Sequence, residues 1–213
     1  MSLVELSITD FVQELASERP APGGGSVAAL AGALAASLCA MVGNLTVGRK
    51  KQEKAWPAMT KVRDEAHVLK AELLRLVDAD TEAYNRVTNA YRLAKENTEQ
   101  QAGRLAAIQA AVHGAAQVPL ETLKALSRLP ELARQALELG NPNCLTDAGV
   151  AVQLVRAAAF GAAYNVRINA RELKDQAEAL KLLAETETTL QQILKEVIKL
   201  EGAVEERLSG FKV

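Results

Sequence analysis

The chain has 213 residues, of which 49% are hydrophobic but only 3% aromatic, and its net charge is -1. So few aromatic residues argue against a β-sandwich or barrel, and the high hydrophobic content argues against disorder. A nearly neutral chain without a basic tail is not expected to bind nucleic acid along a broad surface. Because Ala, Leu and Val supply most of the apolar residues, and Ala and Leu favour helices, the composition predicts an all-α protein.

The spacing of apolar residues predicts a series of helices. In chain order they cover residues 7–18, 27–46, 58–93, 98–118, 119–139, 146–170 and 172–208. Pro119 is expected to kink or restart its helix, and Pro130 to interrupt the next one. No linker or internal repeat divides the chain, so we expect one domain over residues 1–213, folded as an elongated bundle of about six or seven helices.

The predicted helix over residues 27–46 is unusually rich in small residues. Ala28, Gly32, Ala36 and Ala40 form a row at i+4 spacing, which lets another backbone approach closely. No charged residue lies between positions 20 and 48, so this helix belongs at the centre of a bundle or across a dimer interface. The segment is long enough to span a bilayer, but its Ala and Gly content favours a buried helix, and we expect no membrane contact and no signal peptide.

Asp80 occupies a position where the helical periodicity of apolar residues predicts an apolar side chain. The stripe of the 58–93 helix steps from Leu76 to Tyr84, and Asp80 lies between them on the same face, whereas Asp78 points elsewhere. Burial raises the pKa of a carboxyl group towards neutrality, which suits a general acid or base. A structural carboxylate held by a Tyr or Arg of a neighbouring helix fits the same pattern.

Gly23, Gly24, Gly25 and Ser26 precede the predicted small-residue helix, and Ser26 is its expected N-cap. Free N–H groups at a helix start favour an anion or the polar edge of a heterocycle. The same glycines fit a tight turn between helices, and without a preceding strand the motif does not indicate a dinucleotide site.

Other polar residues are candidates for ligand contact. They are basic residues near helix ends, polar residues of the 146–170 helix, and two tyrosines on the Asp80 face: Lys50, Lys51, Arg92, Lys95, Asp147, Asn165, Asn169, Tyr84 and Tyr91. Basic residues at helix C-termini also offset the helix dipole, and Asp147 fits an ordinary N-cap. Two distant cysteines and two histidines have no metal-ligand spacing, so we expect no metal and a reducing cytoplasmic location.

Several segments together resemble the cyclodeaminase family, the C-terminal part of formiminotransferase-cyclodeaminase, which includes stand-alone cyclodeaminases and methenyltetrahydrofolate cyclohydrolases. The matching segments are PAPGGGSVAALAGALAASLCAMVGNLTVGRKK, LVDADTEAYNRV, AYRLAKENTEQ, TDAGVA and GAAYNVRIN. Tyr84 stands where Phe is usual, Ala94 where Pro is common, and Thr146 where Ser is common. None of these departures removes a candidate catalytic group.

The resemblance implies an all-α homodimer with a folate site between protomers and chemistry on the one-carbon unit of tetrahydrofolate. It implies a catalytic Asp in the VDADTEAY segment, where Asp80 fits better than Asp78 because it lies on the interior stripe. The basic residues would then meet the glutamate tail, and the glycine-rich helix start the pterin or the reacting region. The tetrahydrofolate derivative is the substrate, no cofactor is expected, and channelling from a formiminotransferase would need a separate partner.

Three classes of function remain open on the sequence. The first is a folate enzyme that is either a formimidoyltetrahydrofolate cyclodeaminase or a methenyltetrahydrofolate cyclohydrolase, since both need acid or base help at the same carbon. The second is a helical dimerisation module without catalysis. The third is a protein embedded in a membrane by the apolar helix.

Overall fold

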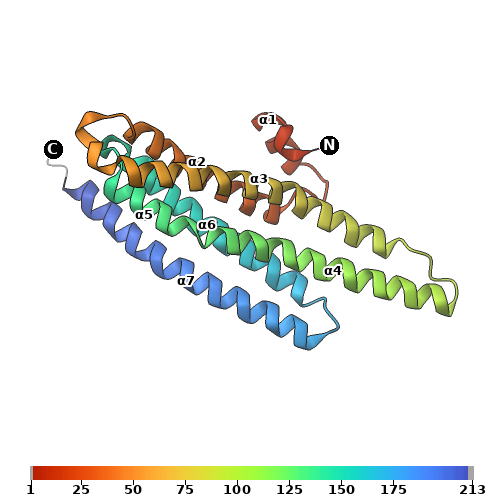
Figure 1. The fold of residues 1–213 in the computed structure, drawn as a ribbon. Coiled ribbons are helices and arrows are strands. Elements are labelled where there is room, and N and C mark those ends of the chain that lie inside the picture. The colour runs from red at the N-terminus through yellow and green to blue at the C-terminus, as the bar shows by residue number, and fades with distance from the viewer. Residues whose placement is uncertain (1, 211–213) are drawn as a thin grey trace.

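The computed structural model describes residues 2–210, and within them it contains seven α-helices and no strand, arranged as an elongated bundle (Figure 1). The helices are α1 (Ile8–Leu15), α2 (Gly24–Thr46), α3 (Trp56–Tyr91), α4 (Thr98–Leu126), α5 (Leu129–Leu139), α6 (Leu145–Ala170) and α7 (Gln176–Ser209). Short 3-10 turns cover Leu3–Glu5, Lys50–Ala55 and Pro142–Cys144. The prediction of an all-α bundle of six or seven helices is confirmed.

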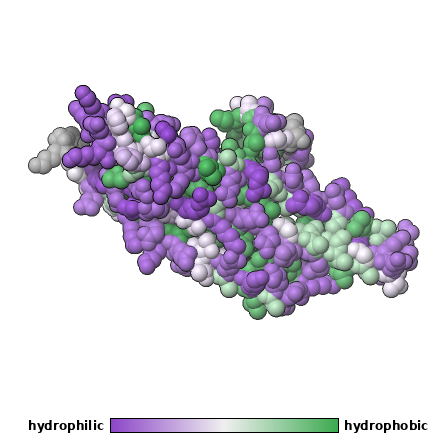
Figure 2. Space-filling model, viewed as in Figure 1, coloured by the Kyte–Doolittle hydropathy of each residue, from purple (hydrophilic) through white to green (hydrophobic). Residues whose placement is uncertain are grey.

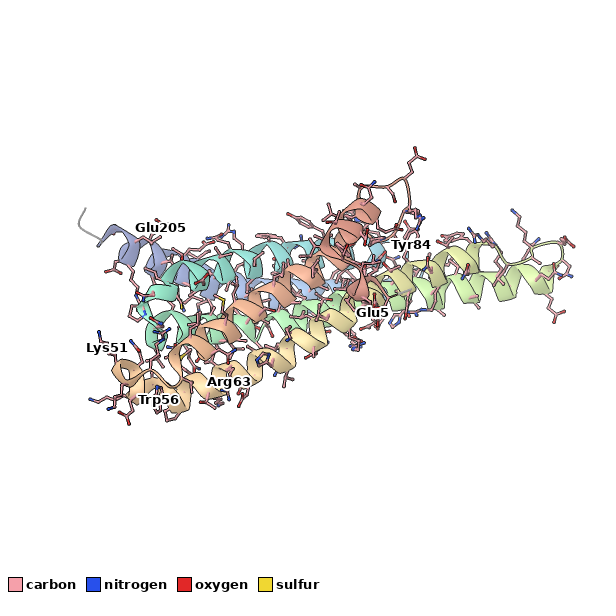
Figure 3. All side chains as sticks on the ribbon, turned by 90° about the horizontal axis from the view of Figure 1, so that it is seen from above. Glu5, Lys51, Trp56, Arg63, Tyr84 and Glu205 are labelled. Atoms are coloured by element: carbon pink, nitrogen blue, oxygen red, sulfur yellow. The ribbon has the colours of Figure 1, made fainter. Side chains whose placement is uncertain are left out.

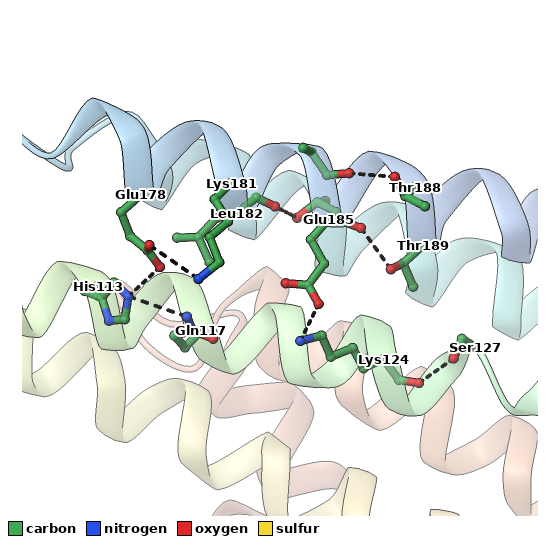
Figure 4. Close-up of polar contacts among 12 residues, drawn as sticks. His113, Gln117, Lys124, Ser127, Glu178, Lys181, Leu182, Glu185, Thr188 and Thr189 are labelled. Atoms are coloured by element: carbon green, nitrogen blue, oxygen red, sulfur yellow. Dashed lines mark hydrogen bonds and ion pairs between the residues drawn. The ribbon is translucent and has the colours of Figure 1, made fainter.

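Each long helix packs against particular neighbours in the bundle. α2 contacts α3 and α6, α4 contacts α3 and α6, and α7 lies against α6. Polar side chains tie α7 to α4: Lys124 pairs with Glu185 at 2.6 Å, and His113 lies 3.3 Å from Glu178 (Figure 4). The ends of α3 and α4 run past the other helices as a hairpin, while α1 stands at the side of the bundle (Figure 1).

Two predicted helix starts are wrong by a few residues. α2 begins at Gly24 with Gly23 as its N-cap, so Ser26 lies inside the helix and is fully buried. α6 begins at Leu145, and Asp147 therefore lies in its first turn and does not cap it. In both cases the helix begins before the polar residue that was expected to cap it. The side chain of that residue therefore does not cap the helix and can make other contacts.

Pro119 does not interrupt α4, contrary to the prediction; the helix continues to Leu126. A proline lacks the N–H that would reach the carbonyl four residues earlier, which here belongs to Ala115. That carbonyl accepts a hydrogen bond from Nδ2 of Asn169 on α6, at 2.8 Å. A partner from another helix therefore satisfies the acceptor that Pro119 leaves free. The second proline, Pro130, lies in the first turn of α5, where it is well tolerated.

Gly43, a small residue of α2 outside the predicted row, allows close contact with α3. A Cβ atom on Gly43 would lie 2.9 Å from the carbonyl oxygen of Met59 and 2.8 Å from the Cβ atom of Arg63, both on α3. Of the described helices, α2 is the one long and apolar enough to cross a membrane, and 61% of its most apolar window is buried in the bundle. One row of its side chains is nevertheless exposed in the single chain, so a central position for α2 stays a prediction.

Replacing Gly43 by Ala is expected to destabilise the protein, because the new methyl group collides with the α3 backbone. We expect a loss of about 1–3 kcal/mol in the free energy of unfolding, measured by urea denaturation followed by circular dichroism. Gly202→Ala on α7 is the matched control, because open space surrounds that position; there a gain of about 0.5–1 kcal/mol is expected. A Gly43→Ala variant as stable as the wild type would contradict the close approach.

Candidate functional site

A cavity of about 270 Å³ lies where the start of α2 meets α3, α4 and the end of α6. It is lined by a loop, a helix start, one acid, one tyrosine and two asparagines: Pro20, Ala21, Gly23, Gly24, Gly25, Asp80, Tyr84, Val87, Ala115, Asn165 and Asn169. The cavity thus brings the predicted carboxylate, glycine-rich segment and asparagine pair together. Within the described residues, no cluster of three or more His, Cys, Asp or Glu side chains could hold a metal ion.

Asp80 lies against the first turn of α2. Its Oδ2 is 3.1 Å from Oγ of Ser26, and the same hydroxyl lies 2.9 Å from the carbonyl oxygen of Val77. A Cβ atom at Gly25 would overlap the Asp80 carboxyl group, so this position requires glycine. Ser26, misplaced in the sequence interpretation as a helix cap, is therefore a direct partner of the candidate catalytic group.

The Ser26 hydroxyl can serve Asp80 in both of its protonation states. When Asp80 is ionised, the hydroxyl donates to its oxygen; when Asp80 is protonated, it can donate to Oγ of Ser26, whose own hydrogen then points to Val77. Burial raises the pKa of Asp80, and hydrogen bonds from the Ser26 side chain and backbone offset part of that rise. A half-buried carboxyl group with a raised pKa and two satisfied states is suited to accepting and returning a proton.

Asn165 and Asn169 form the α6 side of the cavity. Nδ2 of Asn165 donates to the carbonyl oxygen of Gly161 at 2.8 Å, and Nδ2 of Asn169 donates to that of Ala115 at the same distance. Each amide is thereby oriented by one N–H, which leaves its carbonyl oxygen and second N–H for a ligand. These groups match the donor and acceptor edge of a polar heterocycle.

Of the two tyrosines predicted near Asp80, only Tyr84 lines the cavity. Tyr91 lies about 16 Å from Asp80 along α3, because each helical residue advances the chain by about 1.5 Å. Its carbonyl oxygen accepts from Nη2 of Arg104 at 3.0 Å, near the tip of the α3–α4 hairpin. Arg92 and Lys95 are exposed at the same tip. Within one chain, therefore, Tyr91, Arg92 and Lys95 do not line the Asp80 cavity.

Lys50 and Lys51 lie at the other end of α2 from the cavity, and so does Asp147. Figure 3 places Lys51 at one end of the bundle, while Tyr84 lies well along it towards the hairpin. Both lysines line a separate surface pocket with Arg49, Gln52, Asn141 and Asn143. A straight helix of 23 residues separates its two ends by about 34 Å. Within one chain, therefore, these three predicted site residues do not meet Asp80.

Asp78 has a role that the sequence interpretation missed. Its Oδ1 accepts from the backbone N–H of Leu3 at 2.6 Å, and its Oδ2 accepts from Oγ of Ser2, also at 2.6 Å. The carboxylate thus fastens the N-terminal segment, which leads through α1 to the loop at Pro20 and Ala21 that walls the cavity. Two acids spaced by two residues on a helix point to different sides. This spacing alone indicates that Asp78 and Asp80 contact different parts of the protein.

Asp78→Asn is expected to loosen the N-terminal segment while leaving the bundle intact, because the amide forms weaker hydrogen bonds than the carboxylate. Amide hydrogen exchange over residues 3–15 should accelerate about tenfold, with little change in the long helices. The control is Asp64→Asn on the same helix, an exposed acid paired with its neighbour Arg63. Unchanged exchange near the N-terminus would contradict the fastening role.

Asp80→Asn is expected to change how stability depends on pH. Because the folded protein holds the pKa of Asp80 above its ordinary value, the wild type loses stability as pH rises through that raised pKa. The Asn variant has no charge to bury, so its stability relative to the wild type should rise over the same interval and then level off. Urea unfolding of both proteins from about pH 4 to about pH 8 measures this; a pH-independent difference would contradict a raised pKa.

The sequence and the fold were compared with those of known proteins. The family model for formiminotransferase-cyclodeaminase matches residues 7–188. A methenyltetrahydrofolate cyclohydrolase from Methylorubrum extorquens is 38% identical over 202 residues, which cover 95% of this chain and 93% of that protein. Formimidoyltransferase-cyclodeaminase from Rattus norvegicus is 34% identical over 206 residues, which cover 97% of this chain but 38% of that protein.

The fold agrees with these sequence matches. The crystal structure of formiminotetrahydrofolate cyclodeaminase from Thermotoga maritima superimposes with a TM-score of 0.83 and 29% sequence identity, covering 98% of each chain. The family match extends over most of the chain and includes the segments that form the Asp80 cavity. The chain therefore belongs to the formiminotransferase-cyclodeaminase family.

Proposed function

We propose that the chain is a formimidoyltetrahydrofolate cyclodeaminase, which converts 5-formiminotetrahydrofolate to 5,10-methenyltetrahydrofolate and ammonia. The observation that carries this proposal is Asp80: a half-buried carboxyl group with a raised pKa, in a cavity of a protein of this family. The Thermotoga maritima neighbour, which bears the cyclodeaminase name, supports the same reaction.

The reaction needs one proton removed and one delivered. The formimino group on N5 is an amidine and reacts in its protonated form; N10 of the folate attacks its carbon, and the Asp80 carboxylate accepts the proton that N10 loses. Asp80 then returns that proton to the departing nitrogen, the carbon–nitrogen bond breaks, ammonia leaves, and the methenyl bridge remains. Ser26 supports each protonation state of Asp80, while Asn165 and Asn169 orient the polar edge of the pterin. Gly23, Gly24 and Gly25 let the ring approach the start of α2.

The size of the cavity decides which part of the substrate it takes. Pockets that enclose a drug-sized ligand measure roughly 300–1,000 Å³, and this cavity has about 270 Å³. It therefore receives the pterin ring and the one-carbon unit, while the benzoylglutamate tail extends beyond it. The tail carries carboxylates, and no basic residue lines the cavity among the described residues.

A second reaction, hydrolysis of 5,10-methenyltetrahydrofolate, is the alternative. It is favoured by the Methylorubrum extorquens relative, which is named a cyclohydrolase and matches this chain almost end to end. In that reaction Asp80 would accept a proton from the attacking water at the same carbon. Both substrates present the same pterin and the same tail, so the cavity accommodates either.

Purified protein incubated with each substrate separates the two reactions. Ammonia release together with growth of methenyl absorbance identifies the cyclodeaminase, and loss of that absorbance above the spontaneous rate identifies the cyclohydrolase. Turnover of neither folate would contradict both proposals and would leave a non-catalytic helical module.

Asp80→Asn is expected to lower kcat by about 10²- to 10⁴-fold, because an amide cannot exchange the proton. Glu82→Gln provides the control, since Glu82 is an exposed acid two residues away on the same helix and pairs with Arg86. Full activity of Asp80→Asn would rule out the acid–base role. The control should retain wild-type turnover.

A further inference from the structure

The hydroxyl of Ser26 lies at the centre of a cluster of four oxygen atoms. Its Oγ is 2.9 Å from the carbonyl oxygen of Val77, 3.1 Å from Oδ2 of Asp80 and 3.2 Å from Oγ1 of Thr81. Ser26 is fully buried, so its hydroxyl depends on these three neighbours for hydrogen bonds. Thr81 is not among the residues that line the cavity, and its hydroxyl is therefore linked to Asp80 through Ser26.

Thr81 bonds differently from other threonines of the bundle. A threonine inside a helix can donate its hydroxyl to the carbonyl oxygen four residues earlier. Within residues 2–210, the threonines that do so, at 2.6–3.2 Å, are Thr46, Thr122, Thr186, Thr188 and Thr189. The corresponding carbonyl for Thr81 is that of Val77, and it accepts from Ser26 instead. The Thr81 hydroxyl is thus turned towards α2, where it meets Ser26.

A count of hydrogen atoms fixes the direction of these bonds. The carbonyl oxygen of Val77 and the carboxylate of Asp80 can only accept, whereas each hydroxyl has one hydrogen and two lone pairs. The single hydrogen of Ser26 is needed by these two acceptors in turn. The hydrogen between the two hydroxyls therefore comes from Thr81, which donates to Ser26.

Donation from Thr81 favours the ionised form of Asp80. A hydroxyl that accepts a hydrogen bond donates a stronger one, by about 10–30%. When Asp80 is ionised, the bond strengthened in this way is the charge-assisted bond from Ser26 to the carboxylate. When Asp80 is protonated, it donates to Ser26 itself and shares the lone pairs of that oxygen with Thr81. Thr81 therefore stabilises the carboxylate more than the carboxylic acid.

The cluster borders apolar surroundings, in which hydrogen bonds are strong. Val77 also lines a pocket between the N-terminal segment, α1, α2 and α3, whose other lining residues are all apolar: Leu3, Val4, Leu6, Ile8, Phe11, Val12, Leu15, Val27, Leu30 and Leu74. Figure 2 shows apolar residues gathered where α1 stands against the bundle. Low polarity strengthens the electrostatic part of each hydrogen bond, so one hydroxyl has a measurable effect on its neighbours.

Within the described residues, no charged side chain other than Asp80 lines the cavity. There α2 contributes glycines, α4 contributes Ala115, and α6 contributes two asparagines, while Tyr84 of α3 is the other titratable group. Asp78 is held at a different side of α3 by the N-terminal segment. Hydrogen bonds, and not ion pairs, therefore oppose the effect of burial on Asp80.

We propose that the Thr81 hydroxyl positions Asp80 for catalysis: it donates to Ser26 and thereby directs the Ser26 hydrogen to the Asp80 carboxylate, which keeps Asp80 ready to accept a proton. Thr81 touches neither the cavity nor the substrate, so it is a positioning residue. Its effect on turnover rests on the proposed function, in which Asp80 takes a proton from N10 or from water. The hydrogen-bond chain itself needs no substrate.

Thr81→Val tests this role, because it removes the hydroxyl and keeps the branched shape. The Ser26 bond to the carboxylate then weakens, and the pKa of Asp80 should rise by about half a unit. The ¹³C shift of the Asp80 carboxyl carbon, followed across pH without substrate, gives this midpoint. The acid limb of kcat/KM should move to higher pH by the same amount. Accordingly, kcat/KM should fall about threefold below the limb and stay unchanged above it.

Ser26→Ala shows whether Thr81 acts through Ser26. Without the Ser26 hydroxyl, Thr81 has no link to Asp80, so adding Thr81→Val to Ser26→Ala should leave the midpoint unchanged. A shift of the same size in both backgrounds would overturn the role of Ser26 as the link.

Three further variants separate the hydroxyl from packing. Thr81→Ala removes the same hydroxyl without placing a methyl group against Ser26, and should give the same shift even where Thr81→Val does not fold. Thr81→Ser keeps the hydroxyl and should keep the wild-type midpoint. Thr60→Val is the control, because Thr60 is a half-buried threonine of α3 about 30 Å from Asp80 along the helix; its midpoint should equal that of the wild type.

An Asp80 midpoint that stays in place or moves to lower pH in Thr81→Val and Thr81→Ala would overturn the inference. If the wild type turns over neither folate while the midpoint shifts as expected, the proposed function fails and the hydrogen-bond chain stands.

Discussion

The close approach of α2 to α3 is the constraint on which the site depends. Asp80 fits beside the first turn of α2 only because Gly25 has no side chain, and Gly43 allows the same closeness eighteen residues farther along the helix, against the backbone of Met59. The approach removes water from one side of the Asp80 carboxyl group and raises its pKa. It also brings Ser26 within hydrogen-bond distance, so the packing of two helices determines the chemistry of one acid.

The α6 side of the site depends on an equally local feature. Pro119 removes one backbone donor from α4, and the carbonyl of Ala115 then accepts from Asn169. A residue that would ordinarily disrupt a helix instead creates an acceptor that fixes an asparagine of another helix beside the cavity. The helices therefore contribute to the site through backbone groups as well as side chains. Asp78 adds a further link, since it holds the N-terminal segment that leads to the cavity wall.

Much of the fold could be predicted from the sequence because apolar periodicity and small-residue rows report directly on helix packing. Asp80 was found in the same way, as a break in an apolar stripe. Ser26 and Asp147 were misplaced because a polar residue near a helix start resembles a cap, and only the backbone path decides which residue caps it. Lys50, Lys51, Arg92 and Lys95 were assigned to the anionic tail of the substrate, and helix length separates them from the Asp80 cavity within one chain. Spacing along a sequence gives the face of a helix but not the distance between its ends.

The central claim is that Asp80 exchanges a proton with the substrate from an environment that raises its pKa. The most direct measurement follows the ¹³C chemical shift of the Asp80 carboxyl carbon by NMR across pH and compares its midpoint with the limb of the pH profile of kcat/KM. The account predicts that the two midpoints coincide and lie above the ordinary value of about 3.9 for an aspartic acid. A carboxyl group that titrates at its ordinary value, or a profile with no limb at the measured midpoint, would contradict it.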